Sequence, residues 1–297
     1  MAGTAANPSL ARENGQSMAP GLYVVATPIG NARDITLRAL DVLKTCDLLA
    51  AEDTRVTAKL LAIHGVSRPL LAYNDHNAAK ERPRLLARLR QGARIALISD
   101  AGTPLVSDPG YKLVRDALAE DIAVHAIPGA SAVLAALAAA GLPTDRFHFA
   151  GFLPPRSGER RRALEGLRAV QASLILFESP NRLGESLSDM AAILGPRRAA
   201  VCRELTKLHE EVRRGNLDLL AAAYAEEGSP KGEITMVVAP PPEAAPDFAR
   251  AEALLRRALS FMPLREAVDM TADALELSRS AVYSRALAIK ADEESQR

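Results

Sequence analysis

The feature that most constrains the fold is a regular alternation of short apolar runs with amphipathic segments, which begins at Gly21. Strands that alternate with helices are joined in parallel, because each helix returns the chain to the starting edge of the sheet. The pattern predicts an α/β domain over residues 21–142, with a mostly parallel sheet covered by helices on both faces. The expected strands are 22–26, 48–51, 70–73, 94–99 and 123–127, and the expected helices are 35–43 (with Asp34 as N-cap), 56–64, 79–90, 111–120 and 130–140.

A proline-containing segment interrupts this rhythm at 141–155, and a second α/β domain is expected over 143–239. Its expected strands are 174–177, 199–203 and 233–239, and its expected helices are 159–168, 183–194 and 217–225. Prolines make 240–246 a stiff linker, because proline sustains neither helices nor sheet ladders. The remaining part, 247–297, reads as a small helical module with helices at 248–260, 264–275 and 278–290.

Composition excludes several classes of protein. With 48% hydrophobic residues and a net charge of +1, the chain is neither wholly disordered nor a protein that coats nucleic acid by bulk charge. The longest nearly apolar run, Ala130–Leu142, is too short for a membrane span, which needs about 20 residues. Cys46 and Cys202 lack CxxC spacing and the histidines form no HExxH motif, so we expect no metal, no disulfide framework and a reducing compartment.

The first twenty residues lack an apolar core segment and any periodicity. They are typical of a disordered tail and not of a signal peptide. Met18 stands just before the first expected strand and is an alternative start of translation.

Three glycine- and proline-containing loops follow expected strands, where ligands bind in parallel sheets. The first is 27–31, which an ordinary turn also explains, since Pro28 removes a backbone donor and the loop is not GxGxxG. The second, 99–110, contains Asp100, a possible acceptor from an amine or a ribose hydroxyl, although Asp108 as a helix cap is the competing interpretation. The third ends at Ser131, which equally suits a helix cap. Together the three loops favour a nucleoside-like ligand across the sheet edge.

Charged residues gather at further strand ends, in AEDTR (51–55), FESPNR (177–182) and RELTK (203–207). Either they anchor phosphate and activate a hydroxyl, or they form surface salt bridges and helix caps. Two basic segments suit RNA: 156–168, with five arginines, and the last helix, with Arg279, Arg285, Lys290 and Tyr283. A solvated helical face competes with this interpretation, because the module from Asp247 carries as much acid as base.

Several sequence blocks occur in one order over 22–239: LYVVATPIGNARDITLRAL, AAEDTR, LISDAGTPLVSDPG, IPGASAVLAALAAAGLP, FHFAGFLPP, FESPNR, CRELTKLHEE and KGEITMVVA. In these blocks the chain resembles the tetrapyrrole-methylase superfamily, and specifically its members that methylate ribosomal RNA. The helices containing LREAVDMTADALELSRSAVYSRAL resemble the helical appendage of those members. The opening TPIGNARD replaces the glycine-rich GxGxGD of corrin and sirohaem methylases, which favours RNA over a tetrapyrrole as substrate.

This resemblance implies an S-adenosylmethionine-dependent enzyme that methylates the ribose 2′-hydroxyl of a cytidine in 16S rRNA, in the decoding region of the small ribosomal subunit. It also implies two α/β domains with the cofactor in the cleft between them and a homodimer. From the composition we expect a location in the cytoplasm with no membrane contact. The cofactor-binding residues that it implies are Pro28, Ile29, Gly30, Asp100, Ala101, Gly102, Thr103, Gly129, Ser131, Ala132, Phe177, Gly232 and Ile234.

A methyl group on a sulfonium is already activated, so the remaining need is a general base for the ribose hydroxyl. The candidates for this catalytic role are Glu52, Asp53, Glu178, Glu204 and Lys207. Arg55 and Arg203 are candidate phosphate anchors. Two alternatives stay open, namely a methyltransferase of the same fold that acts on a tetrapyrrole or another small acceptor, and a ribosome-binding factor without catalysis.

Overall fold

The computed structural model describes residues 18–105, 110–242, 248–275 and 277–295. The chain forms two compact units, Met1–Pro240 and Pro241–Arg297, and each is described by itself. Most of the predicted N-terminal tail and of the predicted linker lies outside the described residues. Within the described ranges, no helix has both the length and the apolar character needed to cross a membrane.

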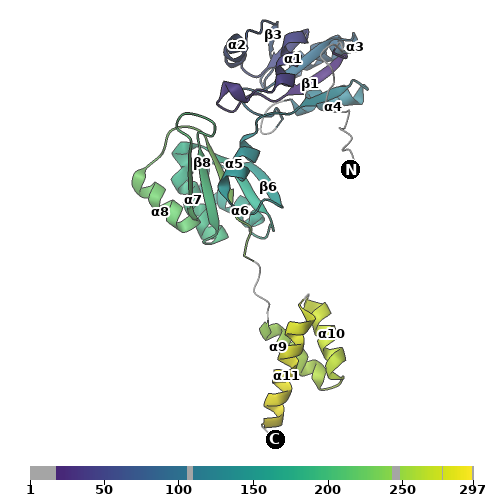
Figure 1. The fold of residues 1–297 in the computed structure, drawn as a ribbon, viewed down its shortest axis with the longest axis vertical. Helices are drawn as coiled ribbons and strands as arrows, with labels where there is room; N and C mark the ends of the chain where they lie inside the picture. The colour runs from purple at the N-terminus through teal and green to yellow at the C-terminus, as the bar shows by residue number, and fades with distance from the viewer. Residues whose placement is uncertain (1–17, 106–109, 243–247, 276, 296–297) are drawn as a thin grey trace, which may run out of the picture. The chain divides into compact units, whose positions relative to one another are not determined.

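The first sheet is wholly parallel, with strand order β3-β2-β4-β1-β5. Its carboxyl ends therefore meet at one edge, which brings the loops after β1, β2, β4 and β5 to the same edge. Figure 1 shows β1 and β3 of this sheet with α1, α2, α3 and α4 around them. The strands are β1 (Gly21–Val25), β2 (Leu48–Ala51), β3 (Leu70–Ala72), β4 (Arg94–Ile98) and β5 (Val124–Ile127).

Two pairs of helices cover the two faces of this sheet. Side chains alternate along each strand, so that Tyr23 and Val25 pack with α1 and α2 while Leu22 packs with α3 and α4. Both faces are apolar because both are covered, as the continuous apolar runs predict. The helices are η2 (Ala32–Asp34), α1 (Leu37–Thr45), α2 (Thr54–Ile63), α3 (Ala78–Arg90) and α4 (Tyr111–Ala119).

The second sheet has strand order β6-β7-β10-β8-β9 and is mixed. Only the β6–β7 pair is parallel, and the other pairs are antiparallel. The strands are β6 (Phe147–Phe152), β7 (Ser173–Glu178), β8 (Arg198–Arg203), β9 (Glu211–Asn216) and β10 (Ile234–Val238). The helices after β5 are α5 (Ala132–Ala140), α6 (Ser157–Leu167), η3 (Pro180–Arg182), α7 (Leu183–Leu194) and α8 (Leu217–Glu227).

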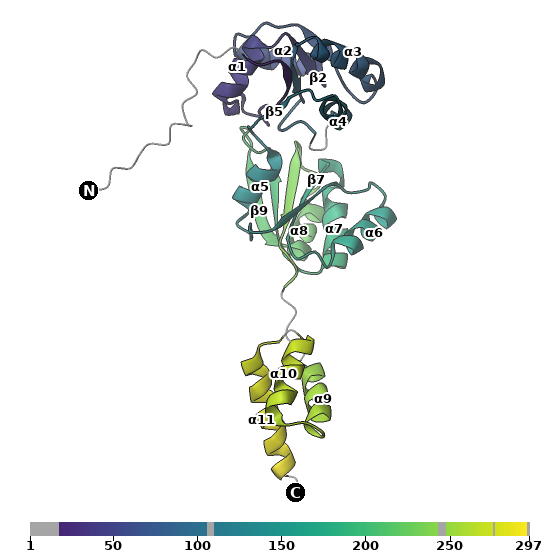
Figure 2. The same ribbon diagram turned by 90° about the vertical axis from the view of Figure 1, so that its right-hand side faces the viewer.

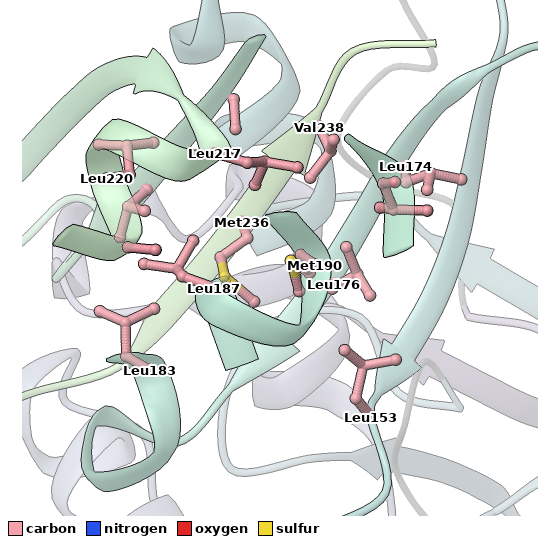
Figure 3. Close-up of a cluster of buried hydrophobic side chains, with 14 of the residues drawn as sticks. Leu153, Leu174, Leu176, Leu183, Leu187, Met190, Leu217, Leu220, Met236 and Val238 are labelled. Atoms are coloured by element: carbon pink, nitrogen blue, oxygen red, sulfur yellow. The ribbon is translucent and has the colours of Figure 1, made fainter. Parts of the chain in front are cut away.

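Both faces of the second sheet are covered by helices. Leu174 and Leu176 of β7 point into the large core under α6, α7 and α8, as Figure 3 shows. Ile175 of the same strand points the other way and packs under α5. Figure 2 shows α5 on one side of these strands and the other three helices on the opposite side.

α5 packs on the second sheet, although it precedes the strands of that sheet in the sequence. The sequence assigned this helix to the first domain, 21–142, but α5 packs on β8, β9 and β10 of the second sheet. Val133, Leu137 and Ala140 lie in the same cluster as Ala200 and Val237. Alternation of strands and helices along the chain does not reveal which sheet a helix covers, and here the chain crosses between the sheets before the helix begins.

Two strands and one helix cap were missed by the sequence patterns. β6 lies in the segment read as an interruption, and its pairing shifts register between Phe149 and Gly151. β9 is an edge strand with charged side chains, a composition that blunts an exposed edge and hides the apolar signal. The predicted cap Asp34 instead ends η2, and Thr36 caps α1 by accepting from the Ala39 N–H. Gly110 stands at the start of α4, and Asp108 lies outside the described residues.

One arginine of the arginine-rich segment 156–168 is part of the fold and is not open to RNA. Arg160 on α6 is only 1% exposed, and its Nε donates to Asp189 Oδ2 on α7 at 2.7 Å. Ser157 Oγ and Arg161 Nη1 donate to the same carboxylate, at 2.9 Å and 3.3 Å. The buried carboxylate thereby fixes α6 against α7.

Replacing Asp189 with alanine should therefore destabilise the protein strongly. The change would remove the nearest counter-charge of the buried Arg160 guanidinium and leave only the exposed Glu185, whose Oε2 is 3.5 Å from Arg160 Nη2. Breaking a buried pair in this way costs about 3–5 kcal/mol in comparable cases. The urea midpoint of unfolding for the full chain should fall accordingly. Glu165→Ala is the control, because its ion pair with Arg168 is exposed and worth less than about 1 kcal/mol. Equal midpoints for the two variants would contradict this reading of Asp189.

The second unit is the small helical module that the sequence predicts. It consists of α9 (Phe248–Leu259), α10 (Leu264–Leu275) and α11 (Arg279–Ser295), around a core that includes Leu255, Val268 and Val282. Two side chains expected to meet RNA are held within the module, since Arg279 pairs with Asp269 and Arg285 pairs with Glu252. Arg285 also lies over the Phe248 ring, 4.6 Å from its centroid.

Candidate functional site

Backbone hydrogen bonds join the loops after β1 and β4. The Thr27 N–H donates to the Gly102 carbonyl at 2.8 Å, and the Gly102 N–H donates back to Thr27 at 3.0 Å. Gly102 has a φ of +79°, a conformation that favours glycine. Gly129, in the loop after β5, is also required, because a Cβ there would meet the Ala26 Cβ at 2.9 Å. The three loops expected to bind a ligand are thus packed together at the carboxyl edge of the first sheet.

A cavity of about 380 Å³ opens between these loops and the second sheet. On one side it is lined by the loop residues Ile29, Ala101, Gly102 and Thr103, by Ser131, which caps α5, and by Ala132, the first residue of α5. On the other side it is lined by Phe177, Gly232 and Ile234. The structure therefore brings most of the predicted cofactor-binding residues to one cavity, although they come from both sheets. Of the remaining four, Pro28, Gly30 and Asp100 line a neighbouring pocket, and Gly129 lines neither.

The cavity has apolar walls and a few polar groups. The Phe152 and Phe177 rings meet edge to face, with their centroids 5.5 Å apart. Ser131 caps α5, so the positive end of this helix dipole faces the cavity. Phe152 was not among the predicted residues because its strand, β6, was missed. The alternating apolar residues of FHFAGF were the signal that could have found it.

Glu178, a predicted catalytic residue, lines the cavity but is fully engaged. It is 3% exposed, and its Oε1 accepts from the Ser179 N–H at 2.7 Å and pairs with Arg182 Nη2 at 2.6 Å. Its Oε2 accepts from Ser186 Oγ. With both oxygens committed to the start of α7, this carboxylate positions the helix, and the geometry does not favour it as a general base.

A second pocket of about 270 Å³ adjoins the cavity and shares Ile29, Ala101 and Glu233 with it. Its apolar wall comes from α2 and from the loop after β1, and includes Val56, Leu60, Ile63 and Pro28. Its polar lining is Thr57, Ser99, Asp100, Lys207 and Glu233. The two spaces together are suited to hold two ligands side by side.

Asp100 is the carboxylate of this pocket that is best placed to take a proton. Its Oδ1 accepts from the Asp53 N–H at 2.9 Å, and among the described residues its Oδ2 has no hydrogen-bond partner. Burial, assisted by the charge of Asp53, raises the pKa of Asp100 above its ordinary value. The sequence predicts Asp100 as a cofactor-binding residue, and the structure places it at the neighbouring pocket.

Asp53 and Arg55 bond mainly to each other. Asp53 caps α2 by accepting from the Arg55 N–H at 2.8 Å, and its Oδ2 pairs with Arg55 Nη2 at 2.6 Å. The hydrogen bonds from Arg55 lower the pKa of Asp53 to about 2, so it is a weak base. The helix-cap interpretation of Asp53 is confirmed. Glu52 lies beside it, and its Oε2 accepts from the Asp100 N–H at 3.4 Å.

Lys207 is held as an ammonium by two carboxylates. Its Nζ donates to Glu204 Oε1 at 2.8 Å and to Glu233 Oε2 at 3.0 Å. Burial lowers the pKa of Lys207, but these hydrogen bonds outweigh it, and the pKa lies above its ordinary value. Lys207 also lowers the pKa of Glu204. Neither Lys207 nor Glu204 is therefore suited to remove a proton. The candidate phosphate anchor Arg203 donates from Nε to Glu211 Oε2 at 3.0 Å and lines neither the cavity nor the second pocket.

Lys207 belongs to a tight loop between β8 and β9 that reaches the first sheet. Thr206 Oγ1 accepts from the Asn31 N–H at 3.1 Å, and a Cβ at Gly30 would meet Lys207 Cγ at 2.4 Å. Thr206 has a φ of +68°, which is strained for a β-branched residue. Strained backbone of this kind is typical of functional sites.

Comparisons with known proteins agree with this architecture. The family described as Tetrapyrrole (Corrin/Porphyrin) Methylases matches residues 21–221. The chain belongs to the tetrapyrrole methylase family. A second family, described as the RsmI C-terminal HTH domain, matches residues 245–290. This tetrapyrrole methylase is 52% identical to "Ribosomal RNA small subunit methyltransferase I" of Mesorhizobium japonicum, over 91% of this chain and 92% of the relative. It is 45% identical to the protein of the same name from Escherichia coli O157:H7, over 90% of this chain and 94% of that relative.

Solved structures share the fold of this tetrapyrrole methylase at low sequence identity. Uroporphyrin-III-C-methyltransferase from Thermus thermophilus has a TM-score of 0.54 and 23% identity, with 74% of this chain and 94% of that chain covered. Diphthine synthase has a TM-score of 0.58 and 19% identity, with 73% of this chain and 89% of that chain covered. A second structure of the Thermus thermophilus enzyme, complexed with S-adenyl homocysteine, has a TM-score of 0.51 and 19% identity, with 73% and 96% covered.

Proposed function

We propose that this protein transfers the methyl group of S-adenosylmethionine to the ribose 2′-hydroxyl of a cytidine in 16S rRNA. Relatives named as methyltransferases of small-subunit ribosomal RNA match nearly the whole chain and support the substrate class. The observation that carries the proposal is the pair of adjoining spaces at the carboxyl edge of the first sheet, which share Ile29, Ala101 and Glu233. One space suits the methyl donor and the other the acceptor.

The cavity residues fit S-adenosylmethionine in shape and chemistry. The flat rings of Phe152 and Phe177 and the side chain of Ile234 suit an adenosine, while the backbone at Gly102 and Gly232 allows close approach. The N-terminus of α5, behind Ser131, suits the methionine carboxylate. When bound, S-adenosylmethionine supplies a methyl group that its sulfonium has already activated.

The protein's own contribution is to orient the acceptor and to take its proton. A ribose hydroxyl is a poor nucleophile until its proton departs, so a positioned base contributes to the rate. We assign this role to Asp100, because it lines the acceptor pocket and its Oδ2 has no hydrogen-bond partner among the described residues. Glu204, Lys207 and Glu178 instead keep the walls in place through their ion pairs.

A tetrapyrrole acceptor is disfavoured by the charges of the second pocket. Tetrapyrrole substrates carry several carboxylates and need positive partners. The pocket presents the carboxylates of Asp100 and Glu233, and its one lysine is already paired with Glu204 and Glu233. A neutral ribose and base avoid this repulsion.

The test is methyl transfer from labelled S-adenosylmethionine to small ribosomal subunits that lack the modification, followed by nucleoside analysis. We expect 2′-O-methylcytidine at one site in the decoding region. Labelling of a tetrapyrrole but not of RNA would favour the first alternative. Binding of the subunit without any transfer, and without cofactor binding, would favour a ribosome-binding factor. The homodimer and the cytoplasmic location stay predictions, which light scattering and cell fractionation test.

A further inference from the structure

One buried hydroxyl of the second pocket has no explanation in the fold. Thr57, on α2, is 2% exposed, and its Oγ1 has no hydrogen-bond partner among the described residues. A threonine within a helix commonly donates to the carbonyl four residues earlier. Here the Asp53 carbonyl accepts from the Thr57 backbone N–H, at 3.1 Å, and the hydroxyl makes no such bond. Buried polar groups are nearly always paired, so an unpaired hydroxyl on a residue that lines a pocket points to a ligand that this side chain meets when it turns about its Cα–Cβ bond.

The position of the pocket limits what this ligand is. Because the pocket shares Ile29 and Ala101 with the cofactor cavity, a group bound here lies beside the proposed methyl donor. Asp100 lines the same pocket. A ligand that fills it can therefore place a hydroxyl near Asp100 and another part of itself against Thr57.

The walls suit a flat and uncharged ring. The apolar surface of the pocket comes from Val56, Leu60 and Ile63 on α2 and from Pro28 in the loop after β1. At about 270 Å³ the pocket is smaller than most pockets for drug-sized ligands, which suits a single nucleoside better than a macrocycle. A base inside a helical RNA is stacked on its neighbours, and one that enters such a pocket has to leave the stack.

We propose that the second pocket holds the acceptor nucleoside, turned out of the RNA stack, with the Thr57 hydroxyl hydrogen-bonded to an edge of its base. This inference rests on the proposed function and adds to it the unstacked state of the acceptor nucleoside and the group that recognises its base. A hydroxyl both donates and accepts, so it can meet the carbonyl, the ring nitrogen or the amine of cytosine. Thr57 is a substrate-binding residue in this arrangement, and Asp100 takes the proton.

The test is Thr57→Val, which removes the hydroxyl and keeps the shape of the side chain. With small subunits lacking the modification as substrate, kcat/KM should fall about tenfold, as expected for one lost hydrogen bond to substrate. The affinity for S-adenosylmethionine should stay unchanged. The melting temperature should stay equal or rise, because an unpaired buried hydroxyl has been removed. If the Thr57 hydroxyl served only to stabilise the fold, its removal in Thr57→Val would lower the melting temperature instead.

Thr54→Val is the matched control, since Thr54 lies on the same helix and does not line the pocket. It should leave kcat/KM within about twofold. A second pair of variants tests the pocket itself. Val56→Trp should block transfer to RNA and leave cofactor binding unchanged. Ala58→Trp, which is exposed and outside the pocket, should leave both transfer and cofactor binding unchanged. Unchanged kcat/KM in Thr57→Val and Val56→Trp, with an active wild type, overturns the inference and leaves the proposed function standing. A wild type that methylates no RNA overturns both.

Discussion

Asp100→Asn should abolish most methyl transfer while the protein still binds S-adenosylmethionine. Positioned general bases contribute about 10²- to 10⁴-fold to a rate, and asparagine cannot take a proton. Its amide oxygen can still accept from the Asp53 N–H, so the loop after β4 should keep its conformation. Single-turnover rates with saturating cofactor and unmodified small subunits measure the loss, and calorimetry checks that the cofactor affinity is unchanged.

The dependence of the rate on pH separates Asp100 from its neighbour Asp53. Burial raises the pKa of Asp100, so its ionised form, and with it the activity, should be lost as the pH falls through a value above that of an ordinary aspartate. Asp53, with its pKa lowered to about 2 by Arg55, would stay ionised over the same range. Asp53→Asn is therefore the control, and we expect only a modest change in rate from the weaker cap of α2.

Retention of activity within a few-fold in Asp100→Asn would show that no base at this position is needed. Alignment of the hydroxyl with the sulfonium and exclusion of water would then account for the rate. A loss of cofactor binding in the same variant would instead place Asp100 in the cofactor site, as the sequence analysis had it.

The sequence predicted the elements that have strong local signals. Buried strands such as Arg94–Ile98 and helices such as Leu183–Leu194 follow from apolar runs and helical spacing, and their observed bounds lie within a few residues of the prediction. The loops with Asp100 and Ser131 could be placed at strand ends for the same reason. Ser131 is the cap of α5, as one of the two interpretations had it.

What the sequence could not supply was the spatial relation of distant segments. The side of the sheet to which α5 belongs depends on Val133 and Leu137 meeting Ala200 and Val237, and no local pattern encodes that meeting. The same holds for the catalytic candidates, which were chosen by charge and by position at a strand end. Their partners decide what they can do, and Glu178, Asp53 and Lys207 each proved to be bonded to a counter-charge.

The second large effect is expected from filling the cavity at Ala132. This residue is half-buried, lies in the first turn of α5 and lines the cavity, so the side chain in Ala132→Phe would project into space that the adenosine or the methionine chain would use. We expect the Kd for S-adenosylmethionine to rise about 100-fold, or about 2.7 kcal/mol. Calorimetric titration of the full chain measures it, and methyl transfer at low cofactor concentration should fall in parallel.

Ala138→Phe makes the same substitution on the same helix at an exposed position outside the cavity. It should leave the Kd within about twofold, because it adds bulk only toward solvent. If α5 simply tolerated aromatic residues poorly, both variants would disturb its packing on the second sheet, and both would bind S-adenosylmethionine more weakly. A difference between them locates the cofactor at the α5 end of the cavity. Unchanged binding in both would mean that the cofactor lies elsewhere, and the assignment of the two adjoining spaces to donor and acceptor would fail with it.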